Sequence, residues 1–151
     1  MSSLVVGTAQ LGMDYGIANI TGRPSKEISR KMLNQAVKKG VKAIDTARAY
    51  GDSESIIGEV LATELKSKVS IITKLAPLPG IKDEIDSSVC ANLVDKSVYK
   101  SMSNLRMRRL HTLLLHRGQH AVDCNGAIFD RLLFHLEKGN ILALGVSVQS
   151  P

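Results

Sequence analysis

Short apolar runs alternate with longer amphipathic stretches along most of the chain. The apolar runs are typical of strands buried on both faces, and they cover residues 3–9, 41–47, 68–75, 110–116 and 141–148. Between them, hydrophobic residues recur every three or four positions, which predicts helices over residues 25–39, 53–65, 85–105 and 126–139. The pattern therefore predicts strands and helices in regular alternation.

The predicted helix over residues 25–39 has clear boundaries. Ser25 is a good N-cap, because its hydroxyl can accept a hydrogen bond from a free backbone N–H of the first turn, and Gly40 suits the C-terminal stop. The predicted buried face carries Ile28, Met32, Leu33, Ala36 and Val37. The corresponding faces of the next two helices carry Ile56, Ile57, Val60, Leu61 and Leu65, and Ile85, Val89, Leu93, Val98 and Leu105.

Alternation of strands and helices favours an α/β fold with a parallel sheet and right-handed crossovers. Two architectures compete, a doubly wound open sheet and part of a (βα)8 barrel. No GxGxxG or GxxxxGK motif follows a predicted strand, which argues against the usual phosphate loops of the open-sheet class. Linkers and low-complexity tracts are also missing from the sequence, so we expect a single domain over residues 1–151.

Polar residues lie at or near the carboxyl ends of four predicted strands: Asp45, Lys74, His116 and Ser147. Because side chains alternate along a strand, they share one face with Val41, Ala43, Ser70, Ile72, Thr112, Leu114, Ala143 and Gly145. The opposite face is more hydrophobic, so we expect it to pack against helices; it carries Ile44, Val69, Ile71, Leu113, Leu115, Leu142, Leu144 and Val146. Catalytic groups of a barrel gather at the carboxyl ends of its strands. Each polar residue alone also has a structural interpretation, but four at one end predict a site.

The chain is 151 residues long, 44% hydrophobic and 23% charged, which is ordinary for a globular protein. Its apolar runs are far shorter than the ~20 residues that a membrane span requires, and the N-terminus lacks a signal-peptide pattern. Cys90 and Cys124 have no metal-ligand spacing, so we interpret them as free thiols. We expect a cytoplasmic protein with no membrane partner and no metal.

The net charge of +6 does not indicate nucleic-acid binding. The three tyrosines and two phenylalanines are scattered and lie outside the basic stretches, whereas single-stranded nucleic acid requires stacking side chains among the cations. We therefore expect a solvated basic surface, and no nucleic-acid partner.

Tyr50 follows Asp45 in the loop after the second predicted strand. A tyrosine serves as a general acid only when its pKa, about 10 in water, is lowered, and a neighbouring ammonium does this by stabilising the phenolate. In this hypothesis Lys74 supplies the ammonium, Asp45 holds it, and a neutral His116 orients a substrate carbonyl. Such a set would polarise and protonate a C=O group while another molecule delivers the electrons.

The segments "DTARAYGDSE", "IITKL", "LLLH" and "ALGVS", with the opening "VVGTAQLGMDYGI", resemble the successive motifs of the aldo-keto reductase family. The resemblance implies a (βα)8 TIM barrel and NADPH-dependent reduction of aldehydes or ketones. It implies that Tyr50 is the general acid, that Lys74 lowers its pKa, that Asp45 pairs with Lys74, and that His116 orients the carbonyl. Ser147, Gly7 and Thr8 would contact the cofactor.

Two departures from the family pattern matter. Val148 follows Ser147 where the family commonly has asparagine, and the sequence stops at Pro151, just after the fifth predicted strand. We therefore expect a truncated, incomplete barrel that self-associates through exposed edge strands. A catalytically inactive remnant, or a half-barrel interaction module without most of the cofactor site, is the alternative. A lyase with a Schiff base at Lys74 would leave Tyr50 unexplained.

Overall fold

The computed structural model describes residues 4–78, 81 and 85–148. Five strands form one parallel sheet in the order β1-β2-β3-β4-β5. The strands are β1 (Val5–Gly7), β2 (Ala43–Asp45), β3 (Ser70–Lys74), β4 (Leu110–Leu115) and β5 (Ile141–Val146). The helices are α1 (Ala9–Gly12), α2 (Lys26–Lys38), α3 (Ser53–Val60), α4 (Thr63–Lys66), α5 (Ser87–Leu105) and α6 (Ala127–Glu137), with short 3₁₀ turns η1 (Gly118–Ala121) and η2 (Asp123–Gly126). Ser3, where the predicted first strand begins, lies outside the described residues.

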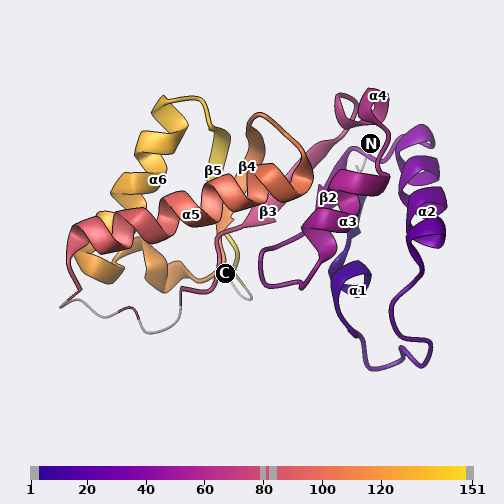
Figure 1. The fold of residues 1–151 in the computed structure, drawn as a ribbon, viewed down its shortest axis with the longest axis horizontal. Helices are drawn as coiled ribbons and strands as arrows, with labels where there is room; N and C mark the ends of the chain where they lie inside the picture. Colours follow the sequence, from indigo (N-terminus) through magenta and orange to yellow (C-terminus); the bar gives the residue numbers. More distant parts are fainter. Residues whose placement is uncertain (1–3, 79–80, 82–84, 149–151) are drawn as a thin grey trace.

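Helices α2, α3, α5 and α6 cover one face of the sheet in the order in which they occur in the chain (Figure 1). In Figure 1, α5 crosses in front of β3 and β4, with α6 to the left and α2 and α3 to the right. The core lies between sheet and helices and includes Leu33, Ile44, Ile57, Ile71, Val94, Val98, Leu113, Leu115, Ile128 and Leu132. The predicted α/β fold with a parallel sheet is confirmed.

The strand register confirms most of the predicted face assignment. Asp45 pairs with Gly7 on one side and Ile72 on the other, so Lys74, two residues beyond Ile72, shares their face. On the opposite face, strands β2 to β4 carry Ile44, Ile71, Leu113 and Leu115, all buried under the helices. The prediction is wrong for Leu142 and Val146, which are 48% and 44% exposed, because β5 is an edge strand.

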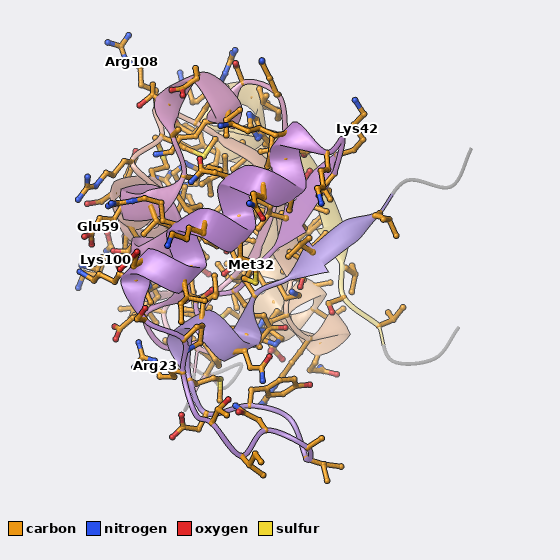
Figure 2. All side chains as sticks on the ribbon, turned by 90° about the vertical axis from the view of Figure 1, so that its right-hand side faces the viewer. Arg23, Met32, Lys42, Glu59, Lys100 and Arg108 are labelled. Atoms are coloured by element: carbon orange, nitrogen blue, oxygen red, sulfur yellow. A yellow bond between two sulfur atoms is a disulfide. The ribbon has the colours of Figure 1, made fainter. Side chains whose placement is uncertain are left out.

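Helix α2 has the predicted ends, but only part of the predicted buried face. The Ser25 hydroxyl accepts a hydrogen bond from the Ile28 N–H at 3.2 Å, and Gly40 adopts a φ of +96° beyond the last turn. Ile28 and Met32 are 57% and 41% exposed, which corrects the prediction. They border a hollow of about 540 Å³ beside the edge strand β1, and Figure 2 labels Met32 on this flank.

The predicted helix over residues 53–65 is divided into α3 and α4. Leu61 is extended, with a ψ of 119°, and this ends α3. The Asn34 side chain of α2 makes the break possible, because it donates to the Val60 carbonyl at 2.9 Å and accepts from the Ala62 N–H at 3.0 Å. A tertiary contact from another helix therefore replaces the hydrogen bonds that a continuous helix would have made.

The interpretation of the two cysteines as free thiols is wrong. Cys90 of α5 and Cys124 of η2 form a disulfide across 34 residues of sequence. Both side chains are buried where α5 packs beside η2, whereas the neighbouring Val89, predicted to be buried, is 47% exposed. Cysteine spacing along the chain does not reveal a pair that only the packing of two distant segments brings together. The disulfide also removes one reason for the cytoplasmic prediction, which stays a prediction.

Within residues 4–78, 81 and 85–148, no helix has the combination of length and apolar character that a membrane crossing requires.

Candidate active site

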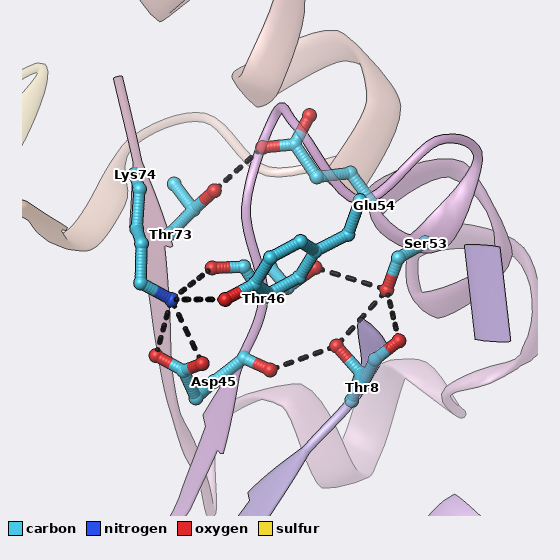
Figure 3. Close-up of polar contacts among 8 residues, drawn as sticks. Thr8, Asp45, Thr46, Ser53, Glu54, Thr73 and Lys74 are labelled. Carbon is cyan, nitrogen blue, oxygen red and sulfur yellow. Dashed lines mark hydrogen bonds and ion pairs between the residues drawn. The ribbon is translucent and has the colours of Figure 1, made fainter. Parts of the chain in front are cut away.

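The carboxyl ends of β2 and β3 bring three of the predicted residues into direct contact. The Lys74 ammonium lies 2.8 Å from each carboxylate oxygen of Asp45 and 3.3 Å from the Tyr50 hydroxyl. It also donates to the Thr46 carbonyl at 3.0 Å. Figure 3 shows these bonds converging on Lys74. Asp45, Tyr50 and Lys74 therefore form one hydrogen-bonded cluster.

Burial explains why Lys74 needs so many partners. Its side chain is 6% exposed, and an ammonium in such a place is stable only when it is paired and hydrogen-bonded. The Asp45 side chain, at 31% exposed, lies nearer to solvent. Because the ammonium donates to the phenol oxygen of Tyr50, the phenolic proton is left to donate elsewhere. The cluster thus leaves an O–H donor available for a substrate.

Two glycines position the loop that carries Tyr50. A Cβ atom on Gly12 of α1 would lie 1.7 Å from the Tyr50 carbonyl oxygen, so only glycine allows this approach. Gly51 has a φ of +55°, and its own Cβ would lie 2.2 Å from the Gly12 carbonyl oxygen. The Asp52 N–H donates to that same oxygen at 3.4 Å. Helix α1, which the sequence pattern did not predict, is therefore the surface against which this loop folds.

His116 lies beside this cluster without a hydrogen bond to it. Its ring meets the Tyr50 ring edge-on, with 6.2 Å between centroids, and its Nδ1 atom is buried with no partner among the described residues. Burial, and secondarily the charge of Lys74, lower the pKa of His116 below the ordinary 6.5. The imidazole is therefore neutral near pH 7, the state that the predicted role requires.

The three predicted cofactor residues lie in different surroundings. Gly7 is exposed and lines a cavity of about 300 Å³ with Ala9, Gln10, Tyr15, Asp45, Tyr50 and Thr8. Thr8 is 1% exposed, and its hydroxyl donates to the Asp45 carbonyl at 2.8 Å. Its side chain therefore stabilises the carboxyl end of β2. Ser147 follows β5, where its backbone N–H donates to the Leu115 carbonyl at 2.9 Å. The cofactor roles of these residues stay predictions.

The first turn of α3 supplies two side chains to which the sequence assigned no role. Ser53 Oγ lies 2.9 Å from both the carbonyl and the hydroxyl oxygen of Thr8 and accepts a hydrogen bond from the Thr46 hydroxyl at 3.0 Å. Glu54 is fully buried and hydrogen-bonds Thr73 at 2.7 Å (Figure 3). The sequence contained one indication of this network: short polar residues, Thr8 and Thr46, directly follow the strands β1 and β2.

Comparisons with known proteins agree on one family. The model of the Aldo/keto reductase family matches residues 3–151. A 6-dehydroglucose reductase of Novosphingobium aromaticivorans is 29% identical over 130 residues, which are 78% of this chain and 40% of the relative. The match therefore spans less than half of that relative.

Solved structures match the fold closely. A protein from Pseudomonas aeruginosa assigned to the aldo-keto reductases has a TM-score of 0.76 and 28% identity, over 97% of this chain and 55% of its own. An aldo-keto reductase from Klebsiella pneumoniae, solved in complex with NADPH, has a TM-score of 0.69 and 20% identity over 97% and 45%. The five parallel strands and their helices thus match about half of an aldo-keto reductase barrel, which confirms the predicted fold class.

Proposed function

The chain belongs to the aldo/keto reductase family, and we propose that its Asp45–Tyr50–Lys74 cluster is the proton-donating site of an NADPH-dependent reductase of aldehydes or ketones. One observation carries the proposal. A buried ammonium binds a carboxylate through two bonds of 2.8 Å and at the same time donates to the phenol of Tyr50 at 3.3 Å. This arrangement suits a tyrosine that must give up its proton and remain as an anion.

In the proposed reaction, Tyr50 donates its phenolic proton to the alkoxide oxygen that develops from the substrate carbonyl. Lys74 then stabilises the resulting phenolate, and Asp45 keeps the ammonium in place. The neutral His116 donates a hydrogen bond to the carbonyl oxygen and orients it. When bound, NADPH supplies the hydride that reduces the carbonyl carbon. General acid catalysis of this kind contributes about 10²–10⁴-fold to the rate.

The cavity beside Tyr50 fits one end of NADPH rather than the whole cofactor. Its volume is about 300 Å³, and the described residues that line it include no lysine or arginine. An uncharged nicotinamide suits such walls, whereas a pyrophosphate requires cations or several backbone donors. In this proposal Gly7 and Ser147 contact the nicotinamide end of the cofactor.

We propose a small, polyhydroxylated carbonyl compound as the substrate. Gln10 and Tyr15 line the cavity and offer an amide and a hydroxyl that can hydrogen-bond substrate hydroxyl groups. The relative from Novosphingobium, which is named for reduction of a glucose derivative, is consistent with this substrate class.

The alternative function is an inactive half barrel that acts by binding another chain. The edges of the sheet favour it, because apolar side chains are exposed beside β1 (Ile28, Met32) and on β5 (Leu142, Val146). Unpaired parallel edges next to apolar surface promote association. We therefore also propose that this single, incomplete barrel domain self-associates, which sedimentation velocity at several concentrations tests directly.

Both functions are tested with the purified chain, NADPH and a panel of aldoses, simple aldehydes and ketones. The reductase proposal expects NADPH oxidation that is matched by formation of the corresponding alcohol. A folded, associating chain that consumes no NADPH with any member of the panel would support the binding alternative and refute the reductase proposal for this chain.

A further inference from the structure

Glu54 has a buried carboxylate that the proposed proton transfer does not use. Its side chain is 1% exposed, and both of its oxygens accept hydrogen bonds. The Thr73 hydroxyl donates to Oε1 at 2.7 Å, while Arg48 Nη1 and Asn104 Nδ2 each donate to Oε2 at 3.1 Å. A carboxylate removed from water is stable only with such partners, so these contacts fix its position.

Two of these partners lie beside the catalytic cluster in the chain. Thr73 directly precedes Lys74 in β3, and Arg48 comes two residues before Tyr50 in the loop after β2. The Arg48 N–H also donates to the Lys74 carbonyl at 3.4 Å. Figure 3 shows Glu54 and Thr73 joined above the Lys74 cluster. One carboxylate therefore connects the strand that carries the ammonium to the loop that carries the phenol.

The environment of Arg48 shows what would follow if this charge were lost. Its side chain is 23% exposed, and its Nε atom is buried without a hydrogen-bond partner among the described residues. Glu54 is the carboxylate that compensates its charge. Without it, the guanidinium gains hydration only by moving outward. Because Tyr50 is two residues away in a tight turn, that movement displaces the phenol from Lys74.

Asn104 supplies the fixed end of the connection. It lies in the last turn of α5, and its amide reaches Glu54 across 50 residues of sequence. Close packing supports this contact, because a Cβ on Gly58 of α3 would lie 2.0 Å from the Asn104 carbonyl oxygen. The contact with Asn104 of α5 thus fixes the position of Glu54. Through its bonds to Thr73 and Arg48, Glu54 in turn fixes the end of β3 and the loop after β2.

We propose that Glu54 is a positioning residue that sets the separation between Lys74 Nζ and the Tyr50 hydroxyl; its kinetic consequence rests on the proposed reductase function. The described hydrogen bonds of Glu54 go to Arg48, Thr73 and Asn104 and not to Tyr50 or Lys74, so Glu54 acts through Arg48 and Thr73. This role explains why a costly buried carboxylate stands in the turn directly after the catalytic loop.

Amide hydrogen exchange tests the positioning without any need for activity. We expect Glu54→Gln to speed exchange of the amides of residues 46–52 roughly tenfold, because the loop opens locally, while β4 and α6 keep their rates. Glu59→Gln is the matched control, since Glu59 lies on the same helix, is exposed (Figure 2) and pairs with Lys26. A uniform rise across the chain, or none in the loop, would overturn the proposal.

A second variant keeps the test decisive if Glu54→Gln does not fold. Arg48→Met removes the hydrogen bond between the loop after β2 and Glu54. It leaves the bonds from Thr73 and Asn104 to Glu54 intact. We expect the same loop-selective increase in exchange. An unchanged loop in a folded Arg48→Met variant would equally refute the positioning role.

Kinetics separate this inference from the proposed function. If the wild-type chain reduces carbonyl compounds, Glu54→Gln should lower kcat by about 10²-fold with little change in KM, because a misplaced acid affects the reaction step more than binding. The double variant Arg48→Met/Glu54→Gln should recover part of this loss, since no uncompensated cation remains. Wild-type kcat in Glu54→Gln would refute the positioning role. An inactive wild-type chain would refute the reductase proposal and leave the exchange result to decide on Glu54.

Discussion

The first three strands and the last two are stabilised at different places. In the first region, polar bonds join the strand ends themselves, through Lys74 to Asp45 and through Ser53 to Thr8 and Thr46. In the second region, the ion pairs and the disulfide of the described residues join α5 to α6 and to η2. The side chain of His116 has a ring contact with Tyr50 but an unpartnered Nδ1.

The contacts of the second region join α5 to η2 and α6, which follow it in the chain. The Cys90–Cys124 disulfide ties α5 to η2. Asp95 of α5 binds Arg131 through two bonds of 2.7 Å and His135 at 2.8 Å, both from α6. The difference shows that hydrogen bonds from Lys74 hold Asp45 and Tyr50 together at the strand ends of the first region, whereas His116 Nδ1 in the second region has no hydrogen-bond partner among the described residues.

Loss of the disulfide should have the largest effect on stability. Closing a loop of 34 residues stabilises a chain by about 4 kcal/mol in the chain-entropy model. We expect the double variant Cys90→Ala/Cys124→Ala to lose stability on this order in urea unfolding, and amide exchange to rise first in β4, β5 and α6. If exchange rises equally in β1 to β3, the two regions are not stabilised independently and the comparison fails.

Gly12→Ala should destabilise the first region, as loss of the disulfide should destabilise the second. The new methyl group would lie 1.7 Å from the Tyr50 carbonyl oxygen, so backbone must move, at a cost of about 3 kcal/mol. Thermal melts check the loss. Gly7→Ala is the matched control, because a Cβ there meets nothing within 4 Å. Equal melting temperatures for the two variants would contradict the close packing of α1 on the Tyr50 loop.

Asp95→Asn should have the smallest effect on the free energy of unfolding. This effect should depend on pH, because it comes from the charge of the Asp95 carboxylate. Hydrogen bonds from Arg131, and secondarily His135, hold the pKa of Asp95 below its ordinary 3.8. Its ionised form therefore stabilises the folded state above pH 3.8, and this contribution disappears as the pH falls through the lower folded pKa.

The wild-type advantage over Asp95→Asn should be on the order of 1 to 2 kcal/mol at neutral pH and should vanish in strong acid. Urea unfolding of both proteins from neutral pH to strong acid measures this difference. Asp130→Asn, which changes an exposed carboxylate of α6, is the control. A difference between wild type and Asp95→Asn that stays constant with pH would show that the Asp95 charge is not involved.

Periodicity and motif order were enough to predict the parallel α/β fold, and they also predicted that Asp45, Tyr50 and Lys74 lie together. The alternation of Ile44 and Asp45 along β2 already predicted which of them faces the helices. The cysteine pairing and the break after α3 were not predictable in this way. Each depends on a partner distant in sequence, such as Asn34 for the break, and local pattern carries no information about such a contact.

Within the candidate site, the proposed catalytic residues were easier to predict than the residues that we propose position them. Lys74 and Asp45 stand out because charged residues rarely end a buried strand. Gly12 and Glu54 lie in stretches where a glycine or a glutamate is ordinary, and their roles follow only from the close approach of separate segments. The structure was therefore needed to find the contacts of Gly12 and Glu54.

The rate of NADPH oxidation by the wild-type chain and by Tyr50→Phe, each with the best carbonyl compound of the panel, tests the central claim most directly. Tyr99→Phe is the matched control, because Tyr99 is an exposed tyrosine on α5 whose ring packs edge-on against His135 of α6. We expect Tyr50→Phe to lower kcat by about 10²–10⁴-fold, the contribution of general acid catalysis, while Tyr99→Phe keeps the wild-type rate. A Tyr50→Phe variant that reduces the same substrate at the wild-type rate would contradict the assignment of Tyr50 as the proton donor.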